Sequence, residues 1–171
     1  MIASPAVALV PATPGDIEFR LRLYIDNRRA EVAAWGWDEA RQNAFLIMQF
    51  NAKLGSYRMQ FPSAAHSIIS VDGCQAGQLI TEHTAGFIDL VDIALLSEFQ
   101  GRGVGRMLIE SLQAHAADAG DSIKLSVDKT NERAKMLYER LGFTVTGETD
   151  FSYWMIWTGS GKQQSQENTN G

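Results

Sequence analysis

The chain has 171 residues, with 15 lysines and arginines against 20 aspartates and glutamates, which gives a formal net charge of −5 at pH 7. At this length a chain buries enough surface to hold a core without a metal or a disulfide. The acidic balance argues against a broad nucleic-acid-binding surface, which needs many lysines and arginines against phosphates. It leaves room for a local basic pocket that binds one anionic ligand.

Cys74 is the only cysteine, so the sequence excludes an internal disulfide and a multi-cysteine metal site. The three histidines lack the spacing of metal ligands, and we expect no bound metal. A single cysteine favours a reducing compartment, so we expect a cytoplasmic protein. No apolar run approaches the roughly 18 residues of a membrane span. Ile2–Val10 lacks a preceding positive charge and contains Pro5, so we expect neither an export signal nor a membrane partner.

The first third of the chain predicts one strand and two helices. A short strand at Ala6–Val10 precedes Thr13-Pro14-Gly15-Asp16, where a threonine cap, a proline and an acidic residue predict a helix start. The residues from Ile17 onward fit both a strand and a helical face, and the capping signal favours the helix. Asp38 is the predicted cap of a second helix, in which apolar residues recur at intervals of three and four: Leu46, Phe50, Leu54 and Tyr57.

From His66 onward the apolar period changes to two. The segments His66–Val71, Ala76–His83 and Phe87–Leu95 alternate as strands do, and turn signals at Asp72-Gly73 and near Gly86 separate them. This pattern predicts an antiparallel meander of three strands.

The remainder predicts two helices and three more strands, which follow in the order helix Val104–Ala119, strand Ile123–Val127, helix Asn131–Leu141, strand Phe143–Val145 and strand Phe151–Trp157. The strand, helix, strand crossover between Leu95 and Val127 requires the two strands to be parallel. The sequence therefore predicts a mixed α/β (α+β) fold, with a twisted sheet of about seven strands flanked by about four helices.

One domain is expected over residues 1–157. Residues 158–171 contain no aliphatic or aromatic side chain, and such a segment buries too little apolar surface to order itself. We expect it to be a disordered polar tail.

The segment between the third meander strand and the following helix carries the strongest chemical signal. Glycines at alternate positions let backbone N–H groups approach a ligand, the helix start adds its positive dipole end, and two arginines add charge; the segment reads Gln100-Gly101-Arg102-Gly103-Val104-Gly105-Arg106. The alternative is a merely tight turn. A P-loop lysine and the third glycine of the dinucleotide fingerprint are both missing, so the pattern predicts a phosphate-bearing ligand of another kind.

Two blocks resemble one family in order and spacing. Gln100-x-x-Gly103-x-Gly105 is similar to the acyl-CoA pyrophosphate loop of the GNAT acetyltransferase superfamily, and Ile93-Ala94-Leu95 resembles the fourth-strand segment ahead of that loop. The later family block is matched by Asn131, Ala134, Tyr138 and Leu141-Gly142-Phe143. The resemblance extends from about Phe87 to Phe143.

This resemblance implies the GNAT fold and an N-acetyltransferase that uses acetyl-CoA as acyl donor, without a metal, by direct attack of a bound amine in a ternary complex. It also implies that the Leu95 N–H donates to the thioester oxygen and that Asn131 meets the pantetheine arm, with helix capping as the alternative for Asn131. The implied donor-binding residues are Ile93, Ala94, Leu95, Gln100, Gly101, Arg102, Gly103, Val104, Gly105, Arg106, Asn131 and Ala134.

Two side chains are the predicted catalytic groups. The resemblance implies that Tyr138 is the general acid for the departing thiolate, and a core tyrosine is the alternative. Asp89 is the first candidate for the base. It lies four positions before Ile93, where some members of the resembled family carry a glutamate base, and a strand period of two puts it on the face of Ile93. Glu82 and His83 are further candidates, while Asp92 has the opposite parity.

The acceptor is expected to be a small-molecule or peptide amine that the sequence does not identify, and the length of the acyl group also stays open. Family members often form homodimers, and the closing strands could pair in this way. A non-catalytic CoA-binding or interaction module is the alternative function.

Overall fold

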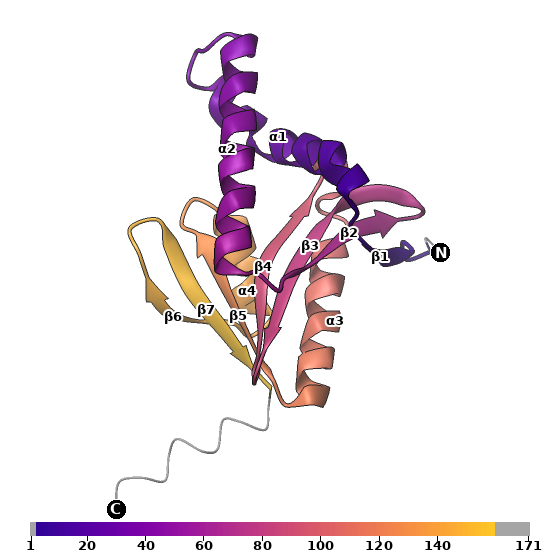
Figure 1. Ribbon diagram of the computed structural model, residues 1–171. Coiled ribbons are helices and arrows are strands. Elements are labelled where there is room, and N and C mark those ends of the chain that lie inside the picture. Colours follow the sequence, from indigo (N-terminus) through magenta and orange to yellow (C-terminus); the bar gives the residue numbers. More distant parts are fainter. Residues whose placement is uncertain (1–2, 160–171) are drawn as a thin grey trace, which may run out of the picture. The chain divides into compact units, whose positions relative to one another are not determined.

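A computed structural model describes residues 3–159 of the chain (Figure 1). Its elements are β1 (Val7–Pro11), the 3₁₀ turn η1 (Pro14–Asp16), α1 (Ile17–Ala33), α2 (Glu39–Gln60), β2 (Ala65–Val71), β3 (Cys74–Thr84), β4 (Phe87–Leu95), the 3₁₀ turn η2 (Ser97–Phe99), α3 (Val104–Ala119), β5 (Ser122–Asp128), α4 (Glu132–Arg140), β6 (Thr144–Glu148) and β7 (Ser152–Thr158).

The strands form a mixed seven-stranded sheet in the order β1-β2-β3-β4-β5-β7-β6. Strand β4 pairs with β5 in parallel, as the crossover predicted, whereas β1 with β2, β5 with β7 and β6 with β7 pair antiparallel. The mixed α/β class, the seven strands and the four α-helices within residues 3–159 are therefore confirmed.

The chain groups into two compact units. The first consists of Met1–Ile80 and Asp92–Gly105, and the second of Thr81–Val91 and Arg106–Gly171. Both fall largely within the span 1–157 for which one domain is expected, and the single domain stays a prediction. Of the expected tail, Thr158 is the last residue of β7, and residues 160–171 lie outside the described part of the chain.

Local signals explain how the helices of the first unit begin. The carboxylate of Asp16 accepts hydrogen bonds from the backbone N–H of Thr13 at 2.7 Å and from its hydroxyl at 3.1 Å. The Asp38 carboxylate accepts from the N–H of Arg41 at 2.8 Å. Each bond satisfies a group at a helix start, so the predicted helices are confirmed as α1 and α2.

The core of the first unit joins its helix α1 to its strands. Phe19 and Leu23 of α1 pack with Ile68 of β2 and with Leu96, and all four are buried. Through this cluster α1 packs against the segment that follows β4. The burial of such side chains, each worth about 1.5–3 kcal/mol, therefore holds α1 beside the end of that strand.

The second unit is organised around β5. Phe87 to Leu90 of β4 pair in parallel with Ser122 to Leu125, and the ladder ends at the Leu90–Leu125 pair. On its other side β5 pairs with β7 over its whole length. Side chains from these strands and from α3 form a buried core that includes Ile88, Leu90, Ile109, Ile123, Leu125 and Met155.

The end of α4 differs by one residue from the prediction. The N–H of Phe143 donates to the carbonyl of Tyr138 at 3.0 Å, and the N–H of Gly142 donates to that of Glu139 at 3.1 Å. Gly142 has a φ of 90°, so this is a Schellman motif with a left-handed glycine. Phe143 belongs to this helix cap, and β6 begins at Thr144 rather than at Phe143.

None of the helices within residues 3–159 has the length and apolar character that crossing a membrane requires.

Candidate active site

The glycine loop between β4 and α3 has the backbone that an anion site needs. Gly101 and Gly103 adopt left-handed conformations, with φ of 72° and 80°, which glycine adopts at little cost. Helix α3 begins at Val104, directly after them. A Cβ atom on Gly103 or on Gly105 would meet no described atom within 4 Å. The loop therefore presents open backbone at a helix N-terminus, where N–H groups bind phosphates.

The two arginines of this loop are exposed and each has a partner. The Arg102 guanidinium lies 5.4 Å from the ring centroid of Phe99. The Nε atom of Arg106 lies 2.9 Å from a carboxylate oxygen of Glu110, one turn further along α3. Exposed pairs of this kind are weak, so both side chains are free to reorient toward a bound phosphate.

Gln100, the first residue of the loop motif, is engaged within the protein. Its side-chain amide donates to the carbonyl of Leu95 at 2.9 Å and to Oδ1 of Asn27 at 3.2 Å. Asn27 in turn donates to the same Leu95 carbonyl at 3.0 Å. The Gln100 side chain thus holds the loop at the end of β4 through its hydrogen bonds. The backbone of the loop therefore remains available to bind an anion.

The end of β4 has an unusually close contact with β3. Residues Val91 to Leu95 are all half-buried. A Cβ atom on Gly77 of β3 would lie 2.1 Å from the carbonyl oxygen of Ala94, so only glycine fits there. Ile93, Ala94 and Leu95 thus form the end of a strand whose backbone packs against β3. Leu95 is also held by hydrogen bonds from the side chains of Asn27 and Gln100.

The later motif block lies in the second unit, at the two ends of α4. The side chain of Asn131 accepts from the N–H of Ala134 at 3.2 Å, and this bond is the helix cap that is the alternative to a ligand contact. Tyr138 is buried, and its ring centroid lies 5.6 Å from that of Phe143. This is the apolar contact that accompanies a Schellman motif. The block therefore has a structural role at both ends of α4, and the predicted ligand and acid roles of Asn131 and Tyr138 stay predictions.

The candidate base Asp89 has a basic partner. Its register partner on β5 is Lys124, whose Nζ atom lies 3.8 Å from a carboxylate oxygen of Asp89. The Asp89 side chain is 22% exposed, so it is accessible, and a role as base would require it to take up a proton beside this ammonium group.

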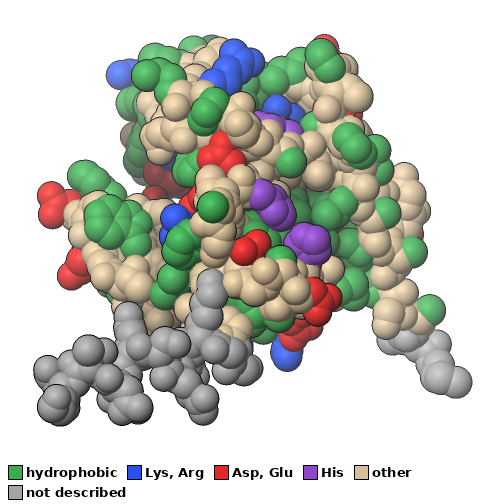
Figure 2. Space-filling view, turned by 60° about the horizontal axis from the view of Figure 1, so that its bottom comes forward, with side chains coloured by type: hydrophobic (Ala, Val, Ile, Leu, Met, Phe, Trp, Pro, Cys, Tyr) green, Lys and Arg blue, Asp and Glu red, His purple; other side chains and the backbone are tan. Residues whose placement is uncertain are grey.

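The two other candidates for the base differ in exposure. Glu82 is buried, whereas His83 is exposed and its ring centroid lies 5.9 Å from that of His115, which is also exposed. Histidine side chains are visible in purple on the face drawn in Figure 2. Of these two candidates, only His83 is therefore open to solvent.

Asp92 belongs to a half-buried polar cluster in the first unit. Its carboxylate accepts from Gln78 at 2.5 Å and lies 3.6 Å from Nζ of Lys53. Gln78 also accepts from Nε of Arg20 at 3.0 Å. The Lys53 ammonium faces the rings of Tyr24 and Tyr57, 5.6 and 5.4 Å from their centroids. The cluster thus combines a carboxylate, two cationic groups and two aromatic rings.

Burial perturbs three titratable groups of this cluster. It lowers the pKa of the Arg20 guanidinium, an effect that nearby Asp92 opposes. It raises the pKa of the Tyr57 hydroxyl, and the Asp92 charge adds to this effect. It also lowers the pKa of His66, whose Nδ1 lies 3.1 Å from the Arg20 guanidinium. Tyr57 therefore stays protonated and His66 stays neutral at pH 7.

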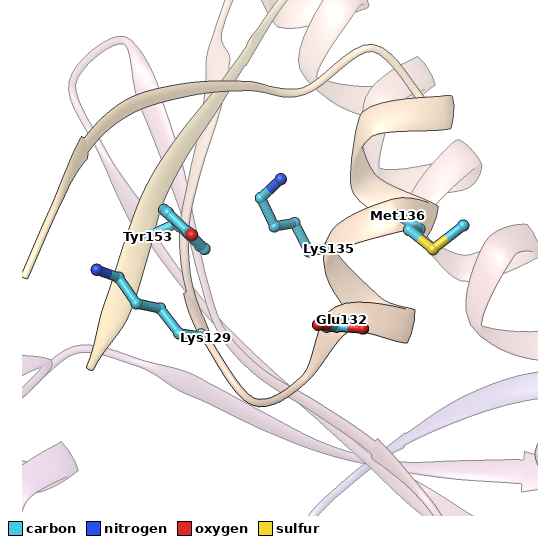
Figure 3. A pocket seen from close by; sticks show the side chains of 5 residues that line it. All are labelled: Lys129, Glu132, Lys135, Met136 and Tyr153. Carbon is cyan, nitrogen blue, oxygen red and sulfur yellow. The ribbon is translucent and has the colours of Figure 1, made fainter. Parts of the chain in front are cut away.

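A separate pocket of about 300 Å³ lies beside α4 in the second unit. Figure 3 shows Lys135 extending from α4 toward Tyr153, with Met136 pointing away. Lys129 and Lys135 each lie 5.1 Å from the Tyr153 ring centroid. Glu148 pairs with Lys129 at 2.6 Å and Glu139 pairs with Lys135 at 2.5 Å, so both ammonium groups of this pocket already have carboxylate partners.

The predicted residues fall into two groups. Ile93 to Leu95 and Gln100 to Gly105 lie in the first unit, whereas Asp89, Arg106, Asn131, Ala134 and Tyr138 lie in the second. Sequence reasoning missed Asn27, which no motif contains. It also missed Gly77, although an isolated glycine inside a strand signals a close backbone approach. Residues 3–159 contain no group of three or more His, Cys, Asp or Glu that could hold a metal ion.

Comparison with known proteins gives the family. The model of the acetyltransferase (GNAT) family matches residues 31–143, a span that includes the glycine loop and the whole of α4. This chain belongs to the GNAT acetyltransferase family. The resemblance deduced from the two sequence blocks is therefore confirmed.

Named relatives match part of the chain. It is 32% identical to a mycothiol acetyltransferase of Corynebacterium aurimucosum over 115 residues, which are 66% of this chain and 38% of that protein. It is 42% identical to the 5-NmdU N-acetyltransferase of Pseudomonas phage PaMx11 over 57 residues, 33% of this chain and 39% of that protein. The chain thus spans well under half the length of these two relatives.

Solved structures agree with the fold. The PaiA N-acetyltransferase of Thermoplasma acidophilum in complex with coenzyme A superposes with a TM-score of 0.67 at 13% identity, covering 90% of this chain and 99% of that chain. An acetyltransferase of Thermus thermophilus gives 0.65 at 18% identity, covering 92% and 100%. The predicted GNAT fold is therefore confirmed.

Proposed function

We propose that this chain is an N-acetyltransferase that transfers an acetyl group from acetyl-CoA to a primary amine. The observation that carries the proposal is the left-handed glycine loop at the start of α3, inside the span that matches the GNAT family. Open backbone N–H groups at a helix N-terminus suit the pyrophosphate of CoA. A solved structure with the same fold is described as a complex with coenzyme A.

In this proposal the donor is held mainly by backbone groups. The loop from Gln100 to Gly105 takes the pyrophosphate, and Arg102 and Arg106 swing toward it. Ile93, Ala94 and Leu95 flank the pantetheine arm and the thioester, while Asn131 and Ala134 contact the arm at the start of α4. Because these contacts are mostly backbone N–H and C=O groups, they depend on loop geometry more than on side-chain charge.

The proposed chemistry is a direct acyl transfer. The amine nitrogen attacks the thioester carbon, the new N–C bond forms, and the C–S bond breaks to release the CoA thiolate. The Leu95 N–H stabilises the oxyanion that develops on the thioester oxygen. Asp89 removes the proton from the amine, and Tyr138 donates a proton to the thiolate. The base matters because an amine with a pKa of about 10.4 is neutral in only about one molecule in 10³ at pH 7.

We further propose that the acceptor is a small molecule or a peptide amine and that the half-buried cluster around Asp92 contributes to its recognition. The named activities of relatives include mycothiol acetylation and spermine/spermidine N(1)-acetylation, so amine acceptors in this family are diverse. The Asp92 carboxylate and the Tyr24 and Tyr57 rings all contact the Lys53 ammonium, and groups that hold one ammonium suit a cationic amine. We propose the cytoplasm as the compartment because the chain carries a single cysteine.

The deciding experiment is an amine screen with acetyl-CoA, in which the mass of the product identifies the acceptor and thiol release gives the rate. Asp89→Asn and Asp92→Asn form a matched pair, since both remove one carboxylate from β4. We expect the Asp89 change to lower kcat and the Asp92 change to act mainly on the KM of the amine.

Two outcomes would contradict the proposal. Tight binding of acetyl-CoA without amine-stimulated thiol release would favour a non-catalytic CoA-binding module. An absence of binding of any CoA species would remove both functions. Equal activity of wild type and the Asp89 variant would leave the acetyltransferase standing and exclude Asp89 as the base.

A further inference from the structure

We propose that Asn27 of α1 and Gly77 of β3 are positioning residues that aim the backbone N–H of Leu95 at the thioester oxygen. This inference rests on the proposed function, in which that N–H is the oxyanion donor. Neither residue belongs to a motif, and both lie in the same compact unit as Leu95 and the glycine loop.

The peptide between Ala94 and Leu95 sets the direction of this N–H. The Ala94 carbonyl oxygen lies 2.1 Å from the place of a Cβ atom on Gly77, so this oxygen points at β3. In a trans peptide the C=O and the following N–H point in opposite directions. The N–H of Leu95 therefore points away from β3, and Gly77 allows this arrangement because it has no side chain.

The peptide between Leu95 and Leu96 also fixes the orientation of Leu95. The N–H of Leu96 donates to the carbonyl of Ala76 on β3 at 2.8 Å. The carbonyl of Leu95 points the opposite way and accepts from Asn27 at 3.0 Å and from Gln100 at 2.9 Å. In an extended strand the N–H and C=O of one residue lie on the same side. The bonds that hold the Leu95 carbonyl thus also fix the direction of its N–H.

Asn27 is itself rigidly held. Its amide nitrogen donates to the carbonyl of Leu23 at 3.0 Å as well as to that of Leu95, and its amide oxygen accepts from Gln100 at 3.2 Å. Asn27, Gln100 and the Leu95 carbonyl thus form a closed ring of three hydrogen bonds. A donor that needs no reorganisation when charge develops gives the largest electrostatic benefit, and this ring supplies that rigidity.

The test uses two non-reactive analogues of acetyl-CoA and calorimetry, so it does not depend on turnover. The carba(dethia) ketone analogue keeps the carbonyl oxygen, whereas S-ethyl-CoA has none. We expect wild type to bind the ketone about three- to tenfold more tightly, the range of one hydrogen bond. In Asn27→Ala this ratio should fall toward one. An equal loss of affinity for both analogues would indicate a change in the pyrophosphate loop. It would not alter the ratio of the two affinities, which is the measure of the Leu95 N–H.

Two further variants complete the design. Asn27→Asp keeps the size of the side chain and an acceptor for Gln100 but loses the donor to Leu95, so it should also lower the ratio and serves if Asn27→Ala does not fold. Asn43→Ala is the matched control. It also removes an asparagine side chain that makes a hydrogen bond, but that side chain accepts from Arg29 at 2.6 Å and not from the Leu95 region. This variant should therefore keep the wild-type ratio.

A wild-type ratio near one, or a wild-type ratio retained in both Asn27 variants, would overturn the positioning role while leaving the acetyltransferase intact. If wild type bound neither analogue, the proposed function itself would fail.

Discussion

The carbonyl oxygen of Ala94 occupies the space that a side chain on Gly77 would need, 2.1 Å from the place of its Cβ atom. The obstacle is backbone and not the tip of a flexible side chain, so β3 and β4 would have to separate to admit a methyl group.

This contact predicts that Gly77→Ala destabilises the protein, by about 1–3 kcal/mol or more, as overpacking does. Urea unfolding followed by circular dichroism measures the effect. Gly55→Ala is the control, because Gly55 lies inside α2 with no described atom within 4 Å of its Cβ position, and alanine favours a helix there. Equal stability of the two variants would show that the strands yield easily.

Gly103→Ala should weaken CoA binding more than Gly105→Ala. Gly103 has a φ of 80°, a conformation that costs an alanine roughly 1–2 kcal/mol, so the loop should change shape. Gly105 lies within α3 without such strain. We expect at least a tenfold rise in the Kd of CoA for the first variant and about twofold for the second, measured by calorimetry. Similar Kd values for both would show that the left-handed loop does not hold the donor.

Tyr138→Phe should lower kcat about a hundredfold, the lower end of what a general acid contributes, and leave the Kd of acetyl-CoA nearly unchanged. The ring contact with Phe143 at the helix cap is retained in this variant. Tyr153→Phe is the matched control, since it removes a hydroxyl from a tyrosine of the α4 pocket and keeps the aromatic face toward Lys129 and Lys135. Unchanged turnover of Tyr138→Phe would remove Tyr138 from the mechanism and leave its role as a helix-capping ring.

The free energy of unfolding should depend on pH through His66. Burial, with the charges of Arg20 and Arg58, lowers the pKa of His66 below its ordinary 6.5, while Asp92 opposes this shift. The unfolded chain then binds the proton more readily than the folded one, so stability contributed by neutral His66 is fully present above pH 6.5 and is lost as the pH falls below it. Urea unfolding between pH 5 and pH 8 should show a shallower acid decline for His66→Gln. Parallel curves for both proteins would assign the acid sensitivity to other groups.

The helices and most strands follow from local patterns. Thr13 with Asp16, and Asp38 alone, indicate helix starts through side chains that satisfy backbone groups only a few residues away. The start of β6 was not predictable in this way, because Phe143 closes the Schellman motif of α4 and an apolar residue after a glycine fits a strand equally well.

The candidate site also contains some features that local patterns predict and others that they do not. The glycine loop and the α4 block are contiguous motifs, so their family and their local conformations could be deduced from residue spacing. The partners of Asp89 and Asp92 could not, because strand parity gives a face but not the residue across the register or on a covering helix. Lys124 faces Asp89 through the β4–β5 pairing, and Lys53 reaches Asp92 from α2.

The sequence by itself determined the mixed α/β class, the family and the loop suited to a pyrophosphate, because each depends on interactions between residues close in the chain. Only the tertiary structure decided what holds Leu95. Asn27 and Gly77 are distant from it in sequence and meet it through helix packing and strand pairing. Such contacts depend on three-dimensional register, which no local periodicity encodes.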